Sequence, residues 1–101
     1  MPHIAIFGTI DFESGDRERW LAHTPTLIEE TEKEPGSRFY SISADPASTS
    51  RIKICEVYED RNAFELHKTS DYVTDFMKAT AECRVVQHSV GWYEAKGIEP
   101  G

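Results

Sequence analysis

Residues 50–70 read SRIKICEVYEDRNAFELHKTS, and this stretch passes from the periodicity of a strand to that of a helix. In its first half the side chains alternate between two faces, which predicts a strand over residues 50–59. One face of this strand carries Ile52, Ile54, Glu56 and Tyr58. Asp60 is then the expected N-cap of a helix. A strand that leads directly into an amphipathic helix is therefore one unit of the fold.

The rest of the chain shows the same two periodicities. Alternating patterns predict further strands over residues 3–12, 37–44 and 85–93. Helical spacing predicts one helix over residues 16–34, bent at Pro25.

We expect that helix to end at Glu34-Pro35-Gly36, because glycine readily adopts the positive φ of a helix C-cap. The helix after Asp60 is expected to break at residues 69–71 and to continue to Thr80. The order strand, helix, strand, strand, helix, strand is typical of the ferredoxin-like α+β fold, with an antiparallel sheet and its helices on one face.

A chain of 101 residues is expected to form one domain, which we place at residues 1–95, followed by a loose tail at residues 96–101. If both helices cover one face of the sheet, the other face exposes apolar residues such as Phe7 or Ile42, depending on the phase of the strands. A large apolar face is rarely left in water. The pattern therefore predicts a homodimer in which a second copy covers this face.

Charge and composition exclude several classes of protein. Eighteen Asp and Glu against eleven Lys and Arg give a net charge of −7, and no basic cluster indicates binding to nucleic acid or to an anionic membrane. No apolar run approaches the roughly 18–20 residues of a membrane helix, and the first residues lack the pattern of a signal peptide. Two cysteines, Cys55 and Cys83, are expected to be reduced thiols in a cytoplasmic protein. No metal-ligand spacing and no nucleotide-binding motif is present.

Four motifs occur in a characteristic order: Glu34-Pro35-Gly36 before an aromatic strand, Glu56-Val57-Tyr58-Glu59-Asp60, Ala63-Phe64-Glu65-Leu66-His67, and Thr69-Ser70 followed by Phe76. Their combination resembles the antibiotic biosynthesis monooxygenase family of dimeric α+β barrels, over about residues 4–93. The resemblance implies a cavity between sheet and helices in each protomer. It also implies an oxygenase that needs no cofactor and converts a small aromatic phenol or hydroquinone, with O₂, into a quinone.

His67 is the candidate catalytic base, because a neutral imidazole accepts a proton from a phenol near pH 7. The alternative is that His67 only braces the junction between two helices. Glu56, a carboxylate among apolar neighbours, either orients His67 or forms a cross-strand or intersubunit ion pair. An aromatic pocket for a planar substrate is expected from Tyr58, Tyr72, Phe76 and Trp92, although aromatic residues on such faces also form an ordinary core.

Two other functions agree with the same residues. One is a dimeric protein that binds a small ligand without converting it. The other is a haem-binding or haem-degrading relative, which is disfavoured because the first strand has no Asn, and because His67 stands where those relatives carry a Trp.

Overall fold

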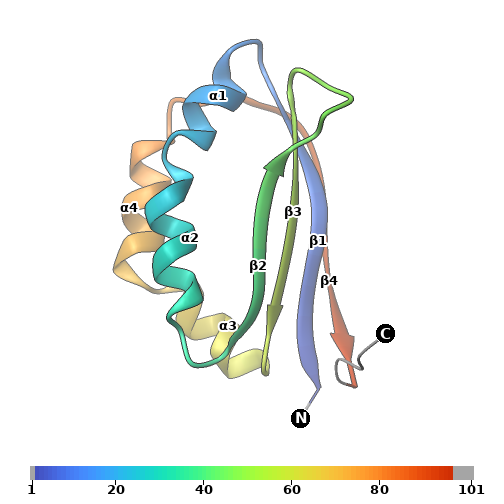
Figure 1. Cartoon of the computed structure of the whole chain (residues 1–101), viewed down its shortest axis with the longest axis vertical. Helices are drawn as coiled ribbons and strands as arrows, with labels where there is room; N and C mark the ends of the chain where they lie inside the picture. Colours follow the sequence, from blue (N-terminus) through green and yellow to red (C-terminus); the bar gives the residue numbers. More distant parts are fainter. Residues whose placement is uncertain (1, 97–101) are drawn as a thin grey trace.

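The computed structural model describes residues 2–96, and it contains one four-stranded antiparallel sheet with the helices on one side (Figure 1). The strands are β1 (His3–Phe12), β2 (Ser37–Ala44), β3 (Arg51–Tyr58) and β4 (Val85–Ala95), in the spatial order β2-β3-β1-β4. The helices are α1 (Asp16–Leu21), α2 (Thr24–Glu32), α3 (Arg61–Lys68) and α4 (Asp71–Ala79). The predicted ferredoxin-like α+β fold is confirmed. Of the predicted loose tail, residues 97–101 lie outside the described part of the chain.

The pairing of β1 with β3 determines which side chains face the helices. Ile4 lies opposite Tyr58 and Ile6 opposite Glu56, and all four side chains are buried. Ala63 and Phe64 of α3 pack against this cluster. The face of β3 that the sequence pattern singled out is therefore the face that the helices cover.

The single bent helix predicted for residues 16–34 is wrong, because α1 ends at Leu21 and α2 begins at Thr24. Pro25 lies in the first turn of α2, where a helix does not need the backbone N–H that proline lacks. The hydroxyl of Thr24 donates a hydrogen bond to the Leu21 carbonyl at 2.7 Å and holds the two helix ends together. Proline thus starts a new helix here.

The predicted break between α3 and α4 is confirmed, and so is the N-cap of α3. The Asp60 side chain accepts a hydrogen bond from the backbone N–H of Ala63 at 2.8 Å. This contact satisfies one of the N–H groups that the first turn of a helix leaves without a partner. The cap fixes where α3 begins, and therefore which of its side chains point toward the sheet.

The second face of the sheet is not covered by any described element (Figure 1). Phe7, Phe39 and Tyr93 have exposed fractions of 47%, 52% and 57%. Phe39 lies opposite Val57 in the register of β2 and β3, and the Phe7 and Tyr93 rings are 5.8 Å apart. Ile42 lies opposite Ile54 on the side of the helices, so of the two residues considered for the open face, Phe7 is the one that occupies it.

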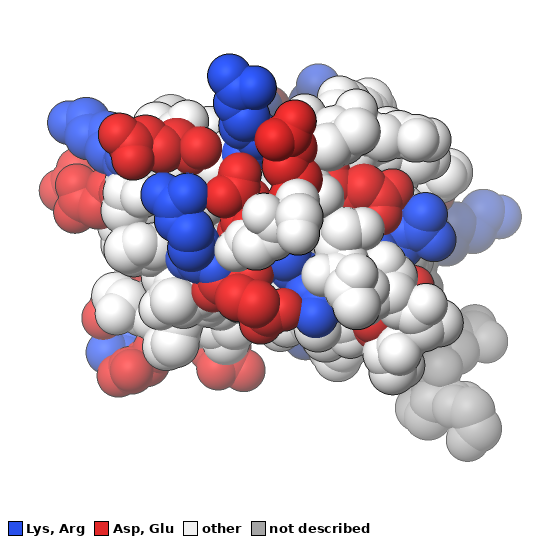
Figure 2. Space-filling view, turned by 90° about the horizontal axis from the view of Figure 1, so that it is seen from above, with Lys and Arg blue, Asp and Glu red and all other residues white. Residues whose placement is uncertain are grey.

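Charged groups of both signs are mixed on the end of the molecule that Figure 2 shows, where Lys and Arg lie among Asp and Glu without a continuous basic region. Within residues 2–96, no helix combines the length and the apolar character needed to cross a membrane.

Gly36 does not have the positive φ expected for it, since Gly15 is the one described residue with such a conformation. The structure gives another reason for glycine at this position. A Cβ atom at residue 36 would lie 2.4 Å from the Cβ of Ala63. The turn before β2 therefore packs so closely on α3 that a side chain does not fit.

We expect Gly36→Ala to lower the free energy of unfolding by about 1–3 kcal/mol, the usual cost of overpacking. Urea denaturation of the single and double variants measures this cost. Ala63→Gly removes the opposing methyl group, so Gly36→Ala should cost much less in that background. Equal costs in both backgrounds would show that the contact with Ala63 is not the reason.

Candidate functional site

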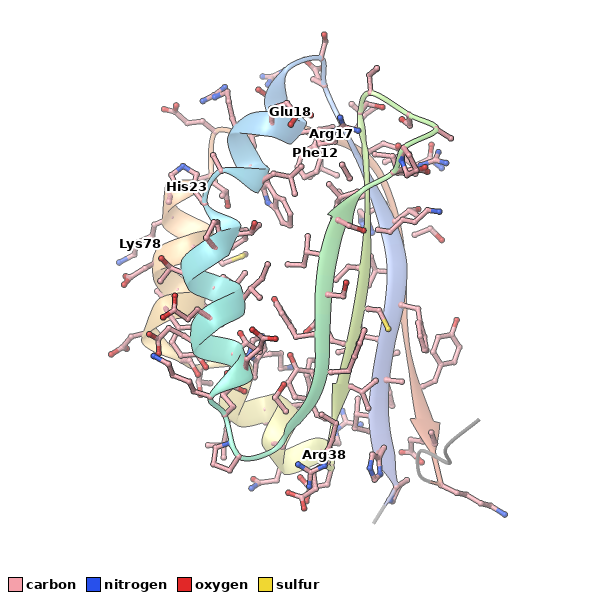
Figure 3. All side chains as sticks on the ribbon, viewed as in Figure 1. Phe12, Arg17, Glu18, His23, Arg38 and Lys78 are labelled. Carbon is pink, nitrogen blue, oxygen red and sulfur yellow. The ribbon has the colours of Figure 1, made fainter. Side chains whose placement is uncertain are left out.

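His67 lies in the last turn of α3, with its side chain 7% exposed between the helices and the sheet. Side chains from both layers fill this space (Figure 3). His67 follows Ala63 by four residues and Phe64 by three, so the three residues share one face of α3. Because Ala63 and Phe64 pack on the core, the same face carries the imidazole inward.

Glu34 holds the imidazole in place. Its Oε2 atom is 2.8 Å from Nδ1 of His67, and the same oxygen accepts a hydrogen bond from the Tyr72 hydroxyl. A carboxylate only accepts hydrogen bonds, so Nδ1 carries the proton. In the neutral ring, Nε2 is then the basic nitrogen.

Glu56 lies on the other side of the ring. Its Oε1 atom is 3.9 Å from Nε2 of His67, which is too far for a hydrogen bond. The same oxygen accepts a hydrogen bond of 2.5 Å from the Tyr58 hydroxyl. Among the described residues, Nε2 therefore has no hydrogen-bond partner and is free to accept a proton.

Burial keeps the neighbouring acids neutral over a wider pH range than in water. It raises the pKa of Glu56 above its ordinary 4.5, and the Glu34 carboxylate adds to the rise, while the Tyr58 hydroxyl and His67 oppose it. Burial is also the main reason why the pKa values of Tyr40 and Tyr58 are raised well above 10, with the charge of Glu56 as the next cause. Both tyrosines consequently remain hydrogen-bond donors at neutral pH.

Three tyrosine rings surround the imidazole. The ring centroids of Tyr58, Tyr40 and Tyr72 lie 5.1, 5.6 and 6.4 Å from that of His67. Tyr40 lies opposite Glu56 in the register of β2 and β3, so its ring is on the side of the sheet that faces the helices. The site is thus an imidazole ring between the acidic side chains of Glu34 and Glu56, with aromatic walls.

Two cavities reach residues of this cluster. One, of about 270 Å³, lies between α2 and α4 and includes Tyr72, Leu27 and Phe76 in its lining. The other, of about 250 Å³, lies beside the turn before β2 and includes Glu34 and Leu66. Each is large enough for a single aromatic ring; one is lined by Tyr72 and the other by Glu34, and His67 itself lines neither.

The structure brings together His67, Glu56, Tyr58 and Tyr72 of the predicted site. It does not bring Phe76 or Trp92 to the imidazole. Phe76 packs edge-on against Trp20, with the ring centroids 5.0 Å apart, and Trp92 lies on β4 beneath Arg61. Tyr58 is completely buried, and its hydroxyl is occupied by Glu56.

Two residues of the cluster, Glu34 and Tyr40, are not predicted from the sequence. The pattern placed Glu34 only at the end of a helix, and it did not single out Tyr40. The signal for Glu34 was its place in the Glu34-Pro35-Gly36 turn before β2, from which its carboxylate contacts His67 and Tyr72. Tyr40 is signalled only by the pairing of β2 with β3, because that register aligns it with Glu56.

A metal site is absent from the part of the chain that the structure describes, where no three His, Cys, Asp or Glu side chains are grouped as metal ligands. Cys55 and Cys83 are free thiols.

The family model for antibiotic biosynthesis monooxygenases matches residues 3–79, a segment that contains every residue of the His67 cluster. The chain therefore belongs to the antibiotic biosynthesis monooxygenase family, as the motifs indicated.

Individual relatives agree with this assignment. A protein of Synechocystis of uncharacterised function is 27% identical over 79 residues, which are 78% of this chain and 54% of that protein, so the match spans about half of the relative. A conserved protein of Methanosarcina mazei has a TM-score of 0.82 at 21% identity and 95% coverage of both chains. A Caulobacter crescentus protein provisionally named an antibiotic biosynthesis monooxygenase has a TM-score of 0.83 at 16% identity, with 97% of this chain and 92% of that chain covered. These two likenesses concern the fold.

The raised pKa of Glu56 predicts how stability depends on pH. Between pH 4.5 and the higher pKa of the folded state, the folded protein binds more protons than the unfolded one, so stability falls as pH rises through this range. Glu56→Gln should flatten this dependence. Urea denaturation from acid to neutral pH measures it, with the exposed Glu29→Gln as the matched control. A wild-type curve that rises over the same range would contradict the assignment.

Proposed function

We propose that this chain is a cofactor-independent monooxygenase that oxidises a small phenol or hydroquinone to a quinone with O₂. The observation that supports it most is the state of His67, whose Nδ1–H is held by Glu34 while Nε2 has no hydrogen-bond partner among the described residues. An imidazole fixed in this way is suited to general-base catalysis. Membership of the monooxygenase family supports the same reaction class.

The reaction begins with transfer of the phenolic proton to Nε2 of His67. The Glu34 carboxylate stabilises the imidazolium, and the phenolate gives one electron to O₂. The two radicals combine at a ring carbon that bears hydrogen and form a peroxide. Breaking its O–O bond, with loss of the ring hydrogen and return of the first proton, gives a quinone and water. One oxygen atom enters the product and the other leaves as water, so O₂ is the sole oxidant and no reductant is consumed.

The surrounding tyrosines have two roles in this proposal. Tyr72, which lines the cavity between α2 and α4, positions the substrate oxygen near the base. Tyr40 and Tyr58 remain neutral and exclude water, so the developing charges interact in a medium of low polarity. Tyr58 acts through Glu56, because its own hydroxyl is not accessible.

Oxygen uptake with a panel of hydroquinones and naphthols tests the proposal. We expect His67→Ala to lower kcat by roughly 10²–10⁴, the usual contribution of a general base, with an unchanged circular dichroism spectrum. His88→Ala, which removes an exposed histidine of β4, is the matched control and should retain full activity. Uptake that survives His67→Ala would remove His67 from the role of base. Ligands that bind and are recovered unmodified under air would instead favour a ligand-binding protein.

We also propose that the functional form is a homodimer formed through the open face of the sheet. Phe7, Phe39 and Tyr93 expose large aromatic surfaces there. Among the paired residues 5–9, 39–43 and 53–57 of β1, β2 and β3, Lys53 is the one charged residue on this face. A second copy of this surface is a suitable partner, because Lys53 of each copy is the one charge that these strand segments bring to the interface.

Light scattering should give twice the monomer mass of 11.5 kDa. Phe7→Lys is expected to shift the assembly to monomers, because it buries a charge in the interface. Leu66→Lys introduces the same charge at an exposed position of α3 and should leave the mass unchanged. A wild-type monomer at micromolar concentration would exclude the dimer.

A further inference from the structure

A third cavity, of about 210 Å³, lies between α3 and the edge strand β4. Its lining consists of Ile4, Arg61, Phe64, Lys68 and Trp92. Ile4 is buried and forms an apolar floor, whereas Trp92 is half exposed and forms a wall. Trp92 faces the helix side because it lies opposite Ile6 in the register of β1 and β4.

Two cations stand over the aromatic walls of this cavity. The guanidinium carbon of Arg61 is 4.9 Å from the centroid of the Trp92 ring, and Nζ of Lys68 is 4.7 Å from that of Phe64. Residues 61, 64 and 68 are three and four positions apart, so they share one face of α3. The helix therefore presents a cation, an aromatic ring and a second cation in a row along the cavity.

The positive charge at the cavity is only partly neutralised. Glu65 is the one carboxylate, among the described residues, within 4 Å of these cations, with contacts of 3.9 Å to Arg61 and 3.2 Å to Lys68. Two cations thus share one exposed carboxylate in a chain whose net charge is −7. An anionic group that enters the cavity meets an unbalanced positive charge, and the Arg61 guanidinium is suited to bind a carboxylate with two hydrogen bonds.

We propose that this cavity is a binding site for a small aromatic carboxylate. The ring of the ligand packs on Ile4 and Phe64 beside Trp92, and its carboxylate binds Arg61 and Lys68. The volume fits a single ring with a short substituent. A neutral ring would leave the two cations sharing Glu65 as their one carboxylate within 4 Å among the described residues, and a carboxylate without a ring would leave the apolar floor exposed to water.

This site is separate from the His67 cluster and does not depend on the proposed monooxygenase activity. The Phe64 ring is 5.4 Å from that of Tyr58, and Tyr58 in turn is 5.1 Å from His67. Two aromatic rings therefore lie between the cavity and the imidazole. The site also lies on the helix side of the sheet, so a second copy on the open face leaves it accessible.

Titration of the ¹⁵N-labelled full chain with benzoate tests the proposal, with the indole N–H signals of Trp92 and Trp20 as reporters. Trp20 packs between Phe12 and Phe76 and serves as an internal control for the fold. We expect a saturable shift of the Trp92 signal, with Trp20 unchanged. Benzamide, acetate and inorganic phosphate should each bind at least roughly tenfold more weakly, because each lacks either the charge or the ring.

Arg61→Gln and Lys68→Gln should each weaken benzoate binding by roughly tenfold, as expected for loss of one charge-assisted hydrogen bond. Lys78→Gln removes the same charge from the exposed side of α4 (Figure 3) and should have no effect. The proposal is overturned if millimolar benzoate causes no saturable shift, if benzamide or phosphate binds equally well, or if both Gln variants bind normally. Binding that is lost in His67→Ala and kept in the Gln variants would place benzoate at the other site.

Discussion

The carboxylate of Glu34 links three elements that are distant in sequence. Glu34 lies in the turn between α2 and β2. One of its carboxylate oxygens accepts hydrogen bonds from His67 at the end of α3 and from Tyr72 at the start of α4. A partly buried carboxylate without such partners is costly, so the hydrogen bonds to Glu34 favour keeping these three segments together. The tautomer of His67, and with it the availability of Nε2, follows from this single contact.

The polar cluster under α3 occupies a position where a small domain would otherwise place apolar side chains. The Tyr58 hydroxyl donates a hydrogen bond to Glu56, and burial shifts the titration of Glu56, Tyr58 and Tyr40 toward the neutral form. Such a cluster adds little stability compared with hydrophobic packing. Beside His67, this concentration of shifted titratable groups marks a candidate functional site.

Strand β3 and helix α3 separate the surroundings of His67 from the basic cavity beside β4. The inward face of α3 carries Ala63, Phe64 and His67, and the neighbouring Arg61 and Lys68 extend that face toward β4. Tyr58 and Phe64 form the wall between the imidazole and the basic cavity. The two environments differ in charge, because the imidazole contacts the Glu34 carboxylate, whereas Arg61 and Lys68 line the basic cavity.

The sequence by itself determined the fold class, the strands, the cap at Asp60 and the break before α4, because these depend on local periodicity and capping. It also predicted His67, Glu56, Tyr58 and Tyr72 as site residues, and the structure brings these four together. The sequence did not predict the separate helices around Pro25, since a proline is compatible both with a bent helix and with the start of a new one. The positive φ expected at Gly36 is also wrong, because glycine is needed there for the close contact with Ala63. Only the tertiary structure placed Glu34 and Tyr40 beside His67, and placed Phe76 and Trp92 away from the imidazole. Those positions depend on strand register and on the packing of helix ends, which bring Glu34 and Tyr40 next to His67 although they precede it by 33 and 27 positions.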